Sequence, residues 1–294
     1  MENDAMQREL EQCRAVIEAE LASYFVDDTP WKNLTEAMRY SLLAGGKRIR
    51  PIIVMQFCKA TGGDMEAALP AACAVERLHT YSLIHDDLPC MDDDELRRGK
   101  PTNHMVYGEC TAVLAGDALQ AAAFETLFDS ALPPENVVRM GRIFARAVGA
   151  SGICGGQILD MEAEGKTLTP DEVARIHEMK TAALLVAAAQ MGAIAGNGTD
   201  EQVAAAGEYA AALGMAFQIR DDILDCIVDT ETLGKPAGSD NANQKSTFVS
   251  LYGLERAEAL VRENTQRAVA AVEGKFKDVE FLCWLAKEME KRKY

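Results

Sequence analysis

Residues 86–95 hold five aspartates and one glutamate in ten positions, and Arg97 and Arg98 follow after Leu96. At an effective dielectric constant of about 20, two carboxylates ~6 Å apart repel each other by roughly 3 kcal/mol. Asp86, Asp87 and Asp92 therefore cannot converge on one cavity without a counter-cation. This stretch predicts a site that is completed by a bound positive ion.

The spacing of the first acidic cluster requires a break in its helix. In an unbroken helix Asp92 would point about 120° away from Asp86, six residues earlier. Pro89 lies between them; it lacks a backbone N–H donor and clashes with the carbonyl group four residues before it. We expect residues 88–91 to bulge out, which lets Asp92 return to the side of Asp86.

A second acidic cluster, FQIRDDILD, occupies residues 217–225. Asp221 and Asp225 are four residues apart, so on a helix both carboxylates can project from one face. Asp222 stands beside them. This pair is spaced to converge without any break in the helix.

Two carboxylate clusters that share a cavity favour Mg²⁺, because hard oxygen ligands with room for water suit magnesium better than zinc. Open positions on such ions are usually filled by phosphate oxygens, which indicates a phosphorylated substrate held from both sides. The alternative is that each acidic run is a solvated helix end, and we expect Asp93, Asp94 and Glu95 to point to solvent. The candidate metal ligands are Asp86, Asp87, Asp92, Asp221, Asp222 and Asp225.

Basic residues complete a candidate anion site. The segment GGKRIRP, residues 45–51, presents Lys47, Arg48 and Arg50 from a glycine-opened turn before a proline that can start a helix. Together with Arg97 and Arg98 they can hold a second phosphate group that lacks metals. The segment is not a P-loop, and taken alone it can also be an ordinary basic loop.

Composition excludes several other classes of protein. The 294 residues are 48% hydrophobic and 26% charged, which is typical of a globular chain, and the net charge of −16 argues against nucleic acid or anionic lipid as partners. Eight scattered cysteines without a C-x-x-C pair indicate reduced thiols, and the acidic N-terminus lacks signal-peptide features. We therefore expect a cytoplasmic protein that is not membrane-bound.

Residue patterns predict an all-α fold. Ala, Leu, Met, Glu, Gln and Arg dominate at helical spacing, and Gly and Pro punctuation leaves about ten helices. No linker divides the chain, so we expect one domain over 1–294. The segments 66–85, 112–128, 178–195 and 202–226 should be inner helices of a bundle around a central cavity, with 5–25 and 255–273 outside.

These motifs, in this order, resemble the trans-isoprenyl diphosphate synthases, also called polyprenyl synthetases, and most closely the bacterial farnesyl diphosphate synthases. The resemblance runs from about residue 35 to 250 and is carried by these segments: GGKRIRP, HTYSLIHDDLPCMDDDELRRGKPTNH, LAGDAL, GGQILD, MKTAAL, FQIRDDILD and LGKPAGSDNANQKST. It implies a homodimer and a Mg²⁺-dependent joining of an allylic diphosphate to isopentenyl diphosphate. Three Mg²⁺ ions per site are implied, for which Mn²⁺ can substitute.

The resemblance also implies roles for single residues. Isopentenyl diphosphate would be held by Lys47, Arg50, His79 and Arg98. Mg²⁺ would be held by Asp86, Asp92 and Asp221. The allylic diphosphate, dimethylallyl or geranyl, or its departing charge would meet Arg97, Lys180, Thr181, Gln218, Lys235 and Lys245.

Product length should depend on the residues below Asp86. Ser82 lies one turn down and Tyr81 beside it, and one turn of ~5.4 Å is about the reach of one isoprene unit. Within the family, an aromatic residue at position 81 together with the two-residue insertion Pro89-Cys90 is similar to the farnesyl-producing bacterial type. The open alternatives are a geranylgeranyl diphosphate synthase, a non-catalytic modulating subunit and a terpene cyclase; Tyr81 can also be simple helix packing.

Overall fold

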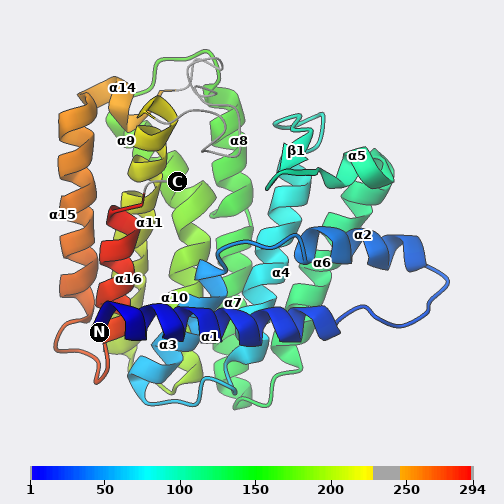
Figure 1. Cartoon of the computed structure of the whole chain (residues 1–294), viewed down its shortest axis with the longest axis horizontal. Coiled ribbons are helices and arrows are strands. Elements are labelled where there is room, and N and C mark those ends of the chain that lie inside the picture. Colours follow the sequence, from blue (N-terminus) through cyan, green and yellow to red (C-terminus); the bar gives the residue numbers. More distant parts are fainter. Residues whose placement is uncertain (1, 228–245, 293–294) are drawn as a thin grey trace.

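The computed structural model describes residues 2–227 and 246–292, and these are almost entirely helical (Figure 1). The elements, in chain order, are α1 (Glu2–Ser23), α2 (Lys32–Leu42), α3 (Ile49–Thr61), α4 (Leu69–Asp86), β1 (Leu96–Arg97), β2 (Lys100–Pro101), α5 (Asn103–Tyr107), α6 (Glu109–Phe128), α7 (Pro134–Val148), α8 (Ile153–Ala163), α9 (Pro170–His177), the π-helical segment η1 (Glu178–Ala182), α10 (Ala183–Ala195), α11 (Asp200–Ile227), α14 (Phe248–Tyr252), α15 (Leu254–Val272) and α16 (Glu280–Glu290). The prediction of an all-α fold is confirmed. Strands β1 and β2 form one two-residue antiparallel hairpin.

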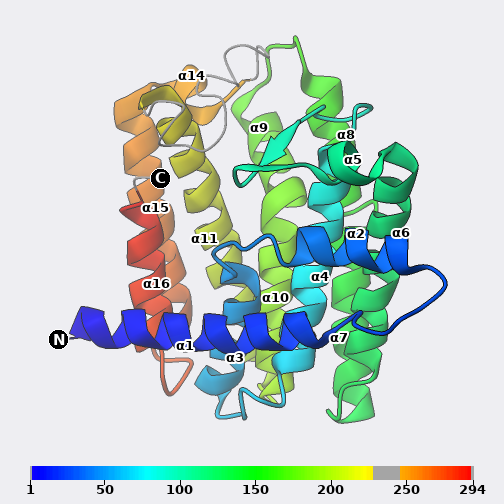
Figure 2. The ribbon, with the colours of Figure 1, turned by 45° about the vertical axis from the view of Figure 1, so that its right-hand side comes forward.

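Most of the long helices run in roughly the same direction or its opposite, while α1 and α2 lie across them in both views (Figures 1 and 2). Helix α1 contacts α3, α4 and α16. Its buried residues Cys13, Ile17 and Leu21 are spaced four apart, so one stripe of the helix faces the bundle. The N-terminal helix is therefore an outer element, as its amphipathic pattern predicts.

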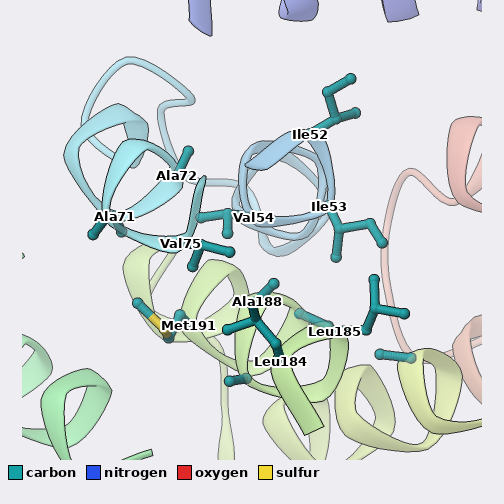
Figure 3. Packing of buried hydrophobic residues seen from close by; sticks show 14 of the residues in the cluster. Ile52, Ile53, Val54, Ala71, Ala72, Val75, Leu184, Leu185, Ala188 and Met191 are labelled. Atoms are coloured by element: carbon teal, nitrogen blue, oxygen red, sulfur yellow. The ribbon is translucent and has the colours of Figure 1, made fainter. Parts of the chain in front are cut away.

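Helix α10 forms the centre of the bundle and packs against α3, α4, α7 and α11. Figure 3 shows Leu184, Ala188 and Met191 of α10 beside apolar side chains of α3 and α4. Close approach is possible because a Cβ atom on Gly192 would lie 2.2 Å from the backbone oxygen of Val54. The apolar run 182–196 is thus a buried core helix, and no helix among the described residues has the length and hydropathy of a membrane span.

The fold brings both acidic clusters to the same end of the bundle. Helix α4 ends at Asp86, and Asp221 lies in the last two turns of α11, whose C-terminal end is on the same side in Figures 1 and 2. Between these helices runs α10. Two segments 135 residues apart in the sequence therefore open into one region of the molecule.

Candidate active site

A cavity of about 1100 Å³ opens between α4, α8, α10, α11 and the basic loop before α3. The predicted site residues that line it are Lys47, Arg50, His79, Ser82, Asp86, Asp92, Arg97, Arg98, Lys180, Thr181, Gln218, Asp221 and Asp222. Tyr81, Asp87 and Asp225 are not among its lining residues. Lys235 and Lys245 lie outside the described residues. The predicted site residues come from separate motifs, and most of them therefore line one cavity.

The first aspartate motif has the expected bulge. The backbone N–H of Asp92 donates to the carbonyl oxygen of Asp86 at 2.8 Å, and the N–H of Asp93 donates to that of Leu88 at 3.2 Å. These bonds close a loop around Pro89, directly after the last residue of α4. The predicted break of the helix and the return of Asp92 to Asp86 are confirmed.

The environment of Asp86 opposes its negative charge. Burial, together with the nearby carboxylate of Asp92, raises the pKa of Asp86 to about 6, while Lys180 and Arg97 act in the other direction. A carboxyl group that is costly to ionise, next to a second carboxylate, is relieved by a divalent cation. This electrostatic strain is the feature of the cavity that best fits a metal ion.

The raised pKa of Asp86 predicts a pH-dependent loss of stability in metal-free protein. Because the pKa is higher in the fold than its ordinary value of 3.8, the folded state holds the proton more tightly, and stability falls as pH rises from about 4 to about 6. The Asp86→Asn variant lacks this ionisation. In EDTA, thermal melting should show the variant gaining more in Tm over the parent at pH about 7 than at pH about 4. Equal gains at both pH values would contradict the prediction.

Asp87 occupies a different environment from its neighbour. Its side chain is buried and lines a small separate pocket, where it accepts a hydrogen bond from Nε of Arg97 at 2.6 Å. Burial raises the pKa of Asp87, and Arg97 opposes that shift. In this geometry Asp87 holds the guanidinium of Arg97 at the wall of the main cavity.

Lys180 and Thr181 are presented by a π-helical turn between α9 and α10. Such turns occur frequently at functional sites. The Nζ of Lys180 donates to Oδ2 of Asp160 on α8 at 2.6 Å. Burial lowers the pKa of Lys180, but Asp160, Asp86 and Asp92 outweigh it and raise the pKa overall, so this ammonium group stays charged. Asp160 was missed by the sequence analysis, although it ends the GGQILD segment.

The second aspartate motif is partly engaged with other elements. Asp221 forms an ion pair with Nη1 of Arg292 at 2.6 Å, and Arg292 also lies over the ring of Phe217, 4.7 Å from its centroid. Asp222 accepts the backbone N–H of Phe248 at 2.8 Å, and Asp225 is buried. Arg292 lines the cavity, and sequence reasoning missed it because it follows the last helix, 71 residues from Asp221.

The basic side of the cavity holds an arginine with an unused donor. Nη1 of Arg50 lies 3.5 Å from Nε2 of His79, whereas its Nε atom is buried and finds no acceptor among residues 2–227 and 246–292. Removal from water and the positive charge of Arg50 keep the pKa of His79 well below its ordinary value, so this imidazole is neutral at pH 7. A buried guanidinium donor without an acceptor is suited to an anionic ligand.

The carboxylates of the cavity suit Mg²⁺ only if a bound substrate supplies further oxygen ligands. Within the described part of the chain, no three His, Cys, Asp or Glu side chains lie together as a ready metal site. Asp86 and Asp92 come from one wall and Asp221 from the other. Because Mg²⁺ usually takes one or two carboxylates plus waters and phosphate oxygens, this arrangement suits metal ions that arrive with a diphosphate.

A solved structure of a known protein matches the fold of this chain. The FPP/GFPP synthase of Zymomonas mobilis has a solved structure with a TM-score of 0.88 and 36% sequence identity, covering 98% of this chain and 99% of that one. The fold is that of the isoprenoid synthases. The family model described as polyprenyl synthetase matches residues 31–283, and the chain belongs to this family of prenyltransferases.

Two curated relatives represent different members of the family. Geranylgeranyl pyrophosphate synthase 3, chloroplastic, of Arabidopsis thaliana is 54% identical over 240 residues, covering 78% of this chain and 66% of the relative. The farnesyl diphosphate synthase of Geobacillus stearothermophilus is 47% identical over 251 residues and 84% of each protein. The chain spans about two thirds of the length of the plant relative. Identity alone therefore does not separate the two product classes.

Proposed function

We propose that the protein is a Mg²⁺-dependent trans-prenyl diphosphate synthase. It joins isopentenyl diphosphate head to tail, in a 1'-4 condensation, with dimethylallyl and then geranyl diphosphate to give (2E,6E)-farnesyl diphosphate. The observation that carries this proposal is one cavity with two kinds of diphosphate site, a basic pocket around Arg50 and a carboxylate pair at Asp86 and Asp92 facing Asp221. Two such sites suit two diphosphate substrates.

The allylic diphosphate would bind between the aspartate motifs. Asp86, Asp92 and Asp221 would hold the metal ions there, while Lys180 and Arg97 supply fixed positive charge to the same region. Bound Mg²⁺ would stabilise the negative charge that develops on the diphosphate as the allylic C–O bond breaks. Fixed ammonium and guanidinium groups add to this stabilisation without having to reorganise.

Isopentenyl diphosphate would bind in the basic pocket. Lys47, Arg50 and Arg98 would meet its charge, and neutral His79 would donate one hydrogen bond. Its double bond then attacks the allylic carbocation, and an oxygen of the released diphosphate can take the proton. No protein nucleophile is required. Thr181 and Gln218 line the cavity and can direct oxygen dipoles at the cation.

The apolar wall of the cavity suits a growing hydrocarbon chain and a reactive cation. Leucines of α10 and α11 line it, together with Ser82 and Leu83 of α4. Such a wall excludes water, which would otherwise quench the carbocation. Tyr81 does not line the cavity described here; its hydroxyl lies 3.5 Å from Sγ of Cys154, and its ring packs edge-on against His85. Tyr81 would therefore limit chain length from behind the wall.

Tyr81→Ala is the variant that tests the control of product length. Removing a ring buried to 94% opens space below Asp86, so we expect a shift from C15 to C20 and longer products with little change in the rate of the first condensation. Chromatographic sizing of dephosphorylated products measures the shift. Tyr209→Phe, which keeps a buried ring and loses only the hydroxyl bonded to the carbonyl oxygen of Leu282, is the control and should leave the product unchanged. An unaltered C15 product from Tyr81→Ala would show that Tyr81 only packs between helices.

A geranylgeranyl diphosphate synthase is the second candidate, favoured by the 54% identity to the plant relative. A non-catalytic subunit or a terpene cyclase has less support, because both aspartate motifs and all four basic-pocket residues are present. Incubation with Mg²⁺, isopentenyl diphosphate and dimethylallyl diphosphate, followed by sizing of the products, distinguishes these functions. No prenyl product, or a cyclic hydrocarbon, would contradict the proposal. Replacing Mg²⁺ by Mn²⁺ tests the metal preference.

We propose that the protein is a homodimer and that it works in the cytoplasm. Helices α5 and α6 expose large apolar side chains that no described element covers: Met105, Val106, Val113, Leu114 and Phe128. Apolar residues gathered on one face are typical of subunit interfaces. All eight cysteines are free thiols, which suits a reducing compartment. Light scattering should give twice the mass of one chain, and a Val113→Glu/Leu114→Glu variant should give one.

A further inference from the structure

Arg48 lies in the basic loop between α2 and α3 and has a left-handed backbone conformation. Its φ is 52° and its ψ is 32°, a region that residues with a Cβ atom occupy at a cost. Gly45 and Gly46, just before it, also have positive φ values of 86° and 133°. A turn of this kind persists only where its surroundings fix it. The contacts of Arg48 show what does so.

All three nitrogens of the Arg48 guanidinium have acceptors. Nε donates to Glu18 of α1 at 2.7 Å, Nη1 to Glu76 of α4 at 2.5 Å, and Nη2 to the carbonyl oxygen of Leu42 at 2.7 Å. The side chain of Arg48 is 0% exposed, and that of Glu76 is 2% exposed. Three of the five N–H donors of Arg48 are therefore bound inside the protein, the side chain is closed off from solvent, and its charge is balanced there.

Glu76 fixes the position of the loop relative to α4. It lies three residues before His79, about one turn away on the same face, and ten residues before Asp86. The Arg48–Glu76 pair thus connects the basic loop to the helix that carries both the basic-pocket histidine and the first aspartate motif. The distance between the two diphosphate sites depends on this connection.

Arg98 holds the same loop from the other side. Its Nη1 donates to the carbonyl oxygen of Gly45, and a Cβ atom on Gly46 would lie 2.8 Å from its guanidinium carbon. The absence of a side chain at Gly46 is what admits Arg98. Lys47 and Arg50 flank Arg48 in the sequence and line the cavity. The loop is therefore clamped at Gly45 and at Arg48, with Lys47 between the clamps.

We propose that Arg48 and Glu76 form a positioning pair that fixes Lys47 and Arg50 for isopentenyl diphosphate without touching that substrate. The proposal rests on the function proposed above. The buried pair holds the strained turn, and because Arg48 and Glu76 neutralise each other, the charges of Lys47, Arg50 and Arg98 act on the diphosphate. Loss of the pair should weaken one substrate selectively, since the aspartate motifs of the allylic site lie at the ends of α4 and α11, outside this loop.

The double variant Arg48→Met/Glu76→Gln tests the proposal. It removes one positive and one negative charge, so the net charge beside the pocket is unchanged. We expect the KM for isopentenyl diphosphate to rise about tenfold or more, because small displacements of binding groups have large effects. The KM for dimethylallyl diphosphate should stay within about twofold of the parent. Hydrogen exchange in residues 43–50 should become faster.

A matched control is Arg256→Met/Glu263→Gln, which removes an exposed Arg–Glu pair on α15 by the same substitutions. It should change neither KM. If the first double variant does not fold, Glu18→Gln removes one anchor from the surface side, and we expect the KM for isopentenyl diphosphate to rise about threefold. An unchanged KM in a folded variant, or an equal rise for both substrates, would overturn the positioning role. Absence of product from the unmodified protein would instead contradict the proposed function.

Discussion

Replacing Asp86 or Asp221 by asparagine is expected to reduce prenyl transfer by about a thousandfold or more while the helical circular dichroism signal stays unchanged. Each carboxylate stands on one wall of the cavity, and a neutral amide there would weaken the hold on a metal–diphosphate complex. A thousandfold loss corresponds to about 4 kcal/mol of transition-state stabilisation. Steady-state rates with isopentenyl and dimethylallyl diphosphate at saturating Mg²⁺ measure the effect.

The control for this experiment lies in the same loop. Asp93 is exposed and carries no bond from its side chain in the described structure, so Asp93→Asn should keep nearly full activity. Addition of EDTA to the parent should abolish turnover, and Mg²⁺ should restore it. Activity within about tenfold of the parent in either Asp86→Asn or Asp221→Asn would refute the assigned roles of the two motifs.

Gly156→Ala is expected to lower kcat by about a hundredfold, although the glycine carries no chemistry. A Cβ atom at this position of α8 would lie 2.2 Å from the backbone nitrogen of Lys180 and 2.7 Å from its Cα atom. Backbone atoms cannot turn aside as a side chain can, so the π-helical segment must move and carry Lys180 with it. Displacement of a charged group by about 1 Å has effects of this size.

Gly141→Ala in α7 is the matched control, because its added Cβ atom would meet the side chain of Phe128, which is exposed and able to shift. This variant should retain its kcat. In Gly156→Ala the KM for the allylic substrate should change more than that for isopentenyl diphosphate, since Lys180 faces Asp86 and Asp92. Equal activity of Gly156→Ala and the parent would show that Lys180 is not held by this contact.

The sequence predicted those parts of the site whose geometry follows from local rules. Pro89 cannot continue a helix, so the end of α4 and the return of Asp92 followed from one residue. The i,i+4 spacing of Asp221 and Asp225 placed both on one helix, and α11 does carry both, but only Asp221 of the two lines the cavity. Residues near the start of α3 were recognised by their composition, because glycine and clustered basic side chains favour an anion-binding loop.

What the sequence did not predict depends on contacts between distant segments. Tyr81 and Ser82 are neighbours about 100° apart on α4, and only the packing of α8 decides that Ser82 lines the cavity while Tyr81 meets Cys154. Asp87 was grouped with the metal ligands because it stands beside Asp86, yet its partner is Arg97, ten residues later. Arg292 reaches Asp221 across 71 residues, a distance that no local pattern covers.

The π-helical segment between α9 and α10 has a consequence for how this chain can change in length. Its wider turn accommodates one more residue than an α-helix would over the same rise. Deleting a single residue from 178–182 would let this turn close into a regular α-helical turn, with α9 and α10 kept in phase on either side of it. A one-codon deletion would therefore spare the surrounding helices and remove only the widened turn that presents Lys180 and Thr181.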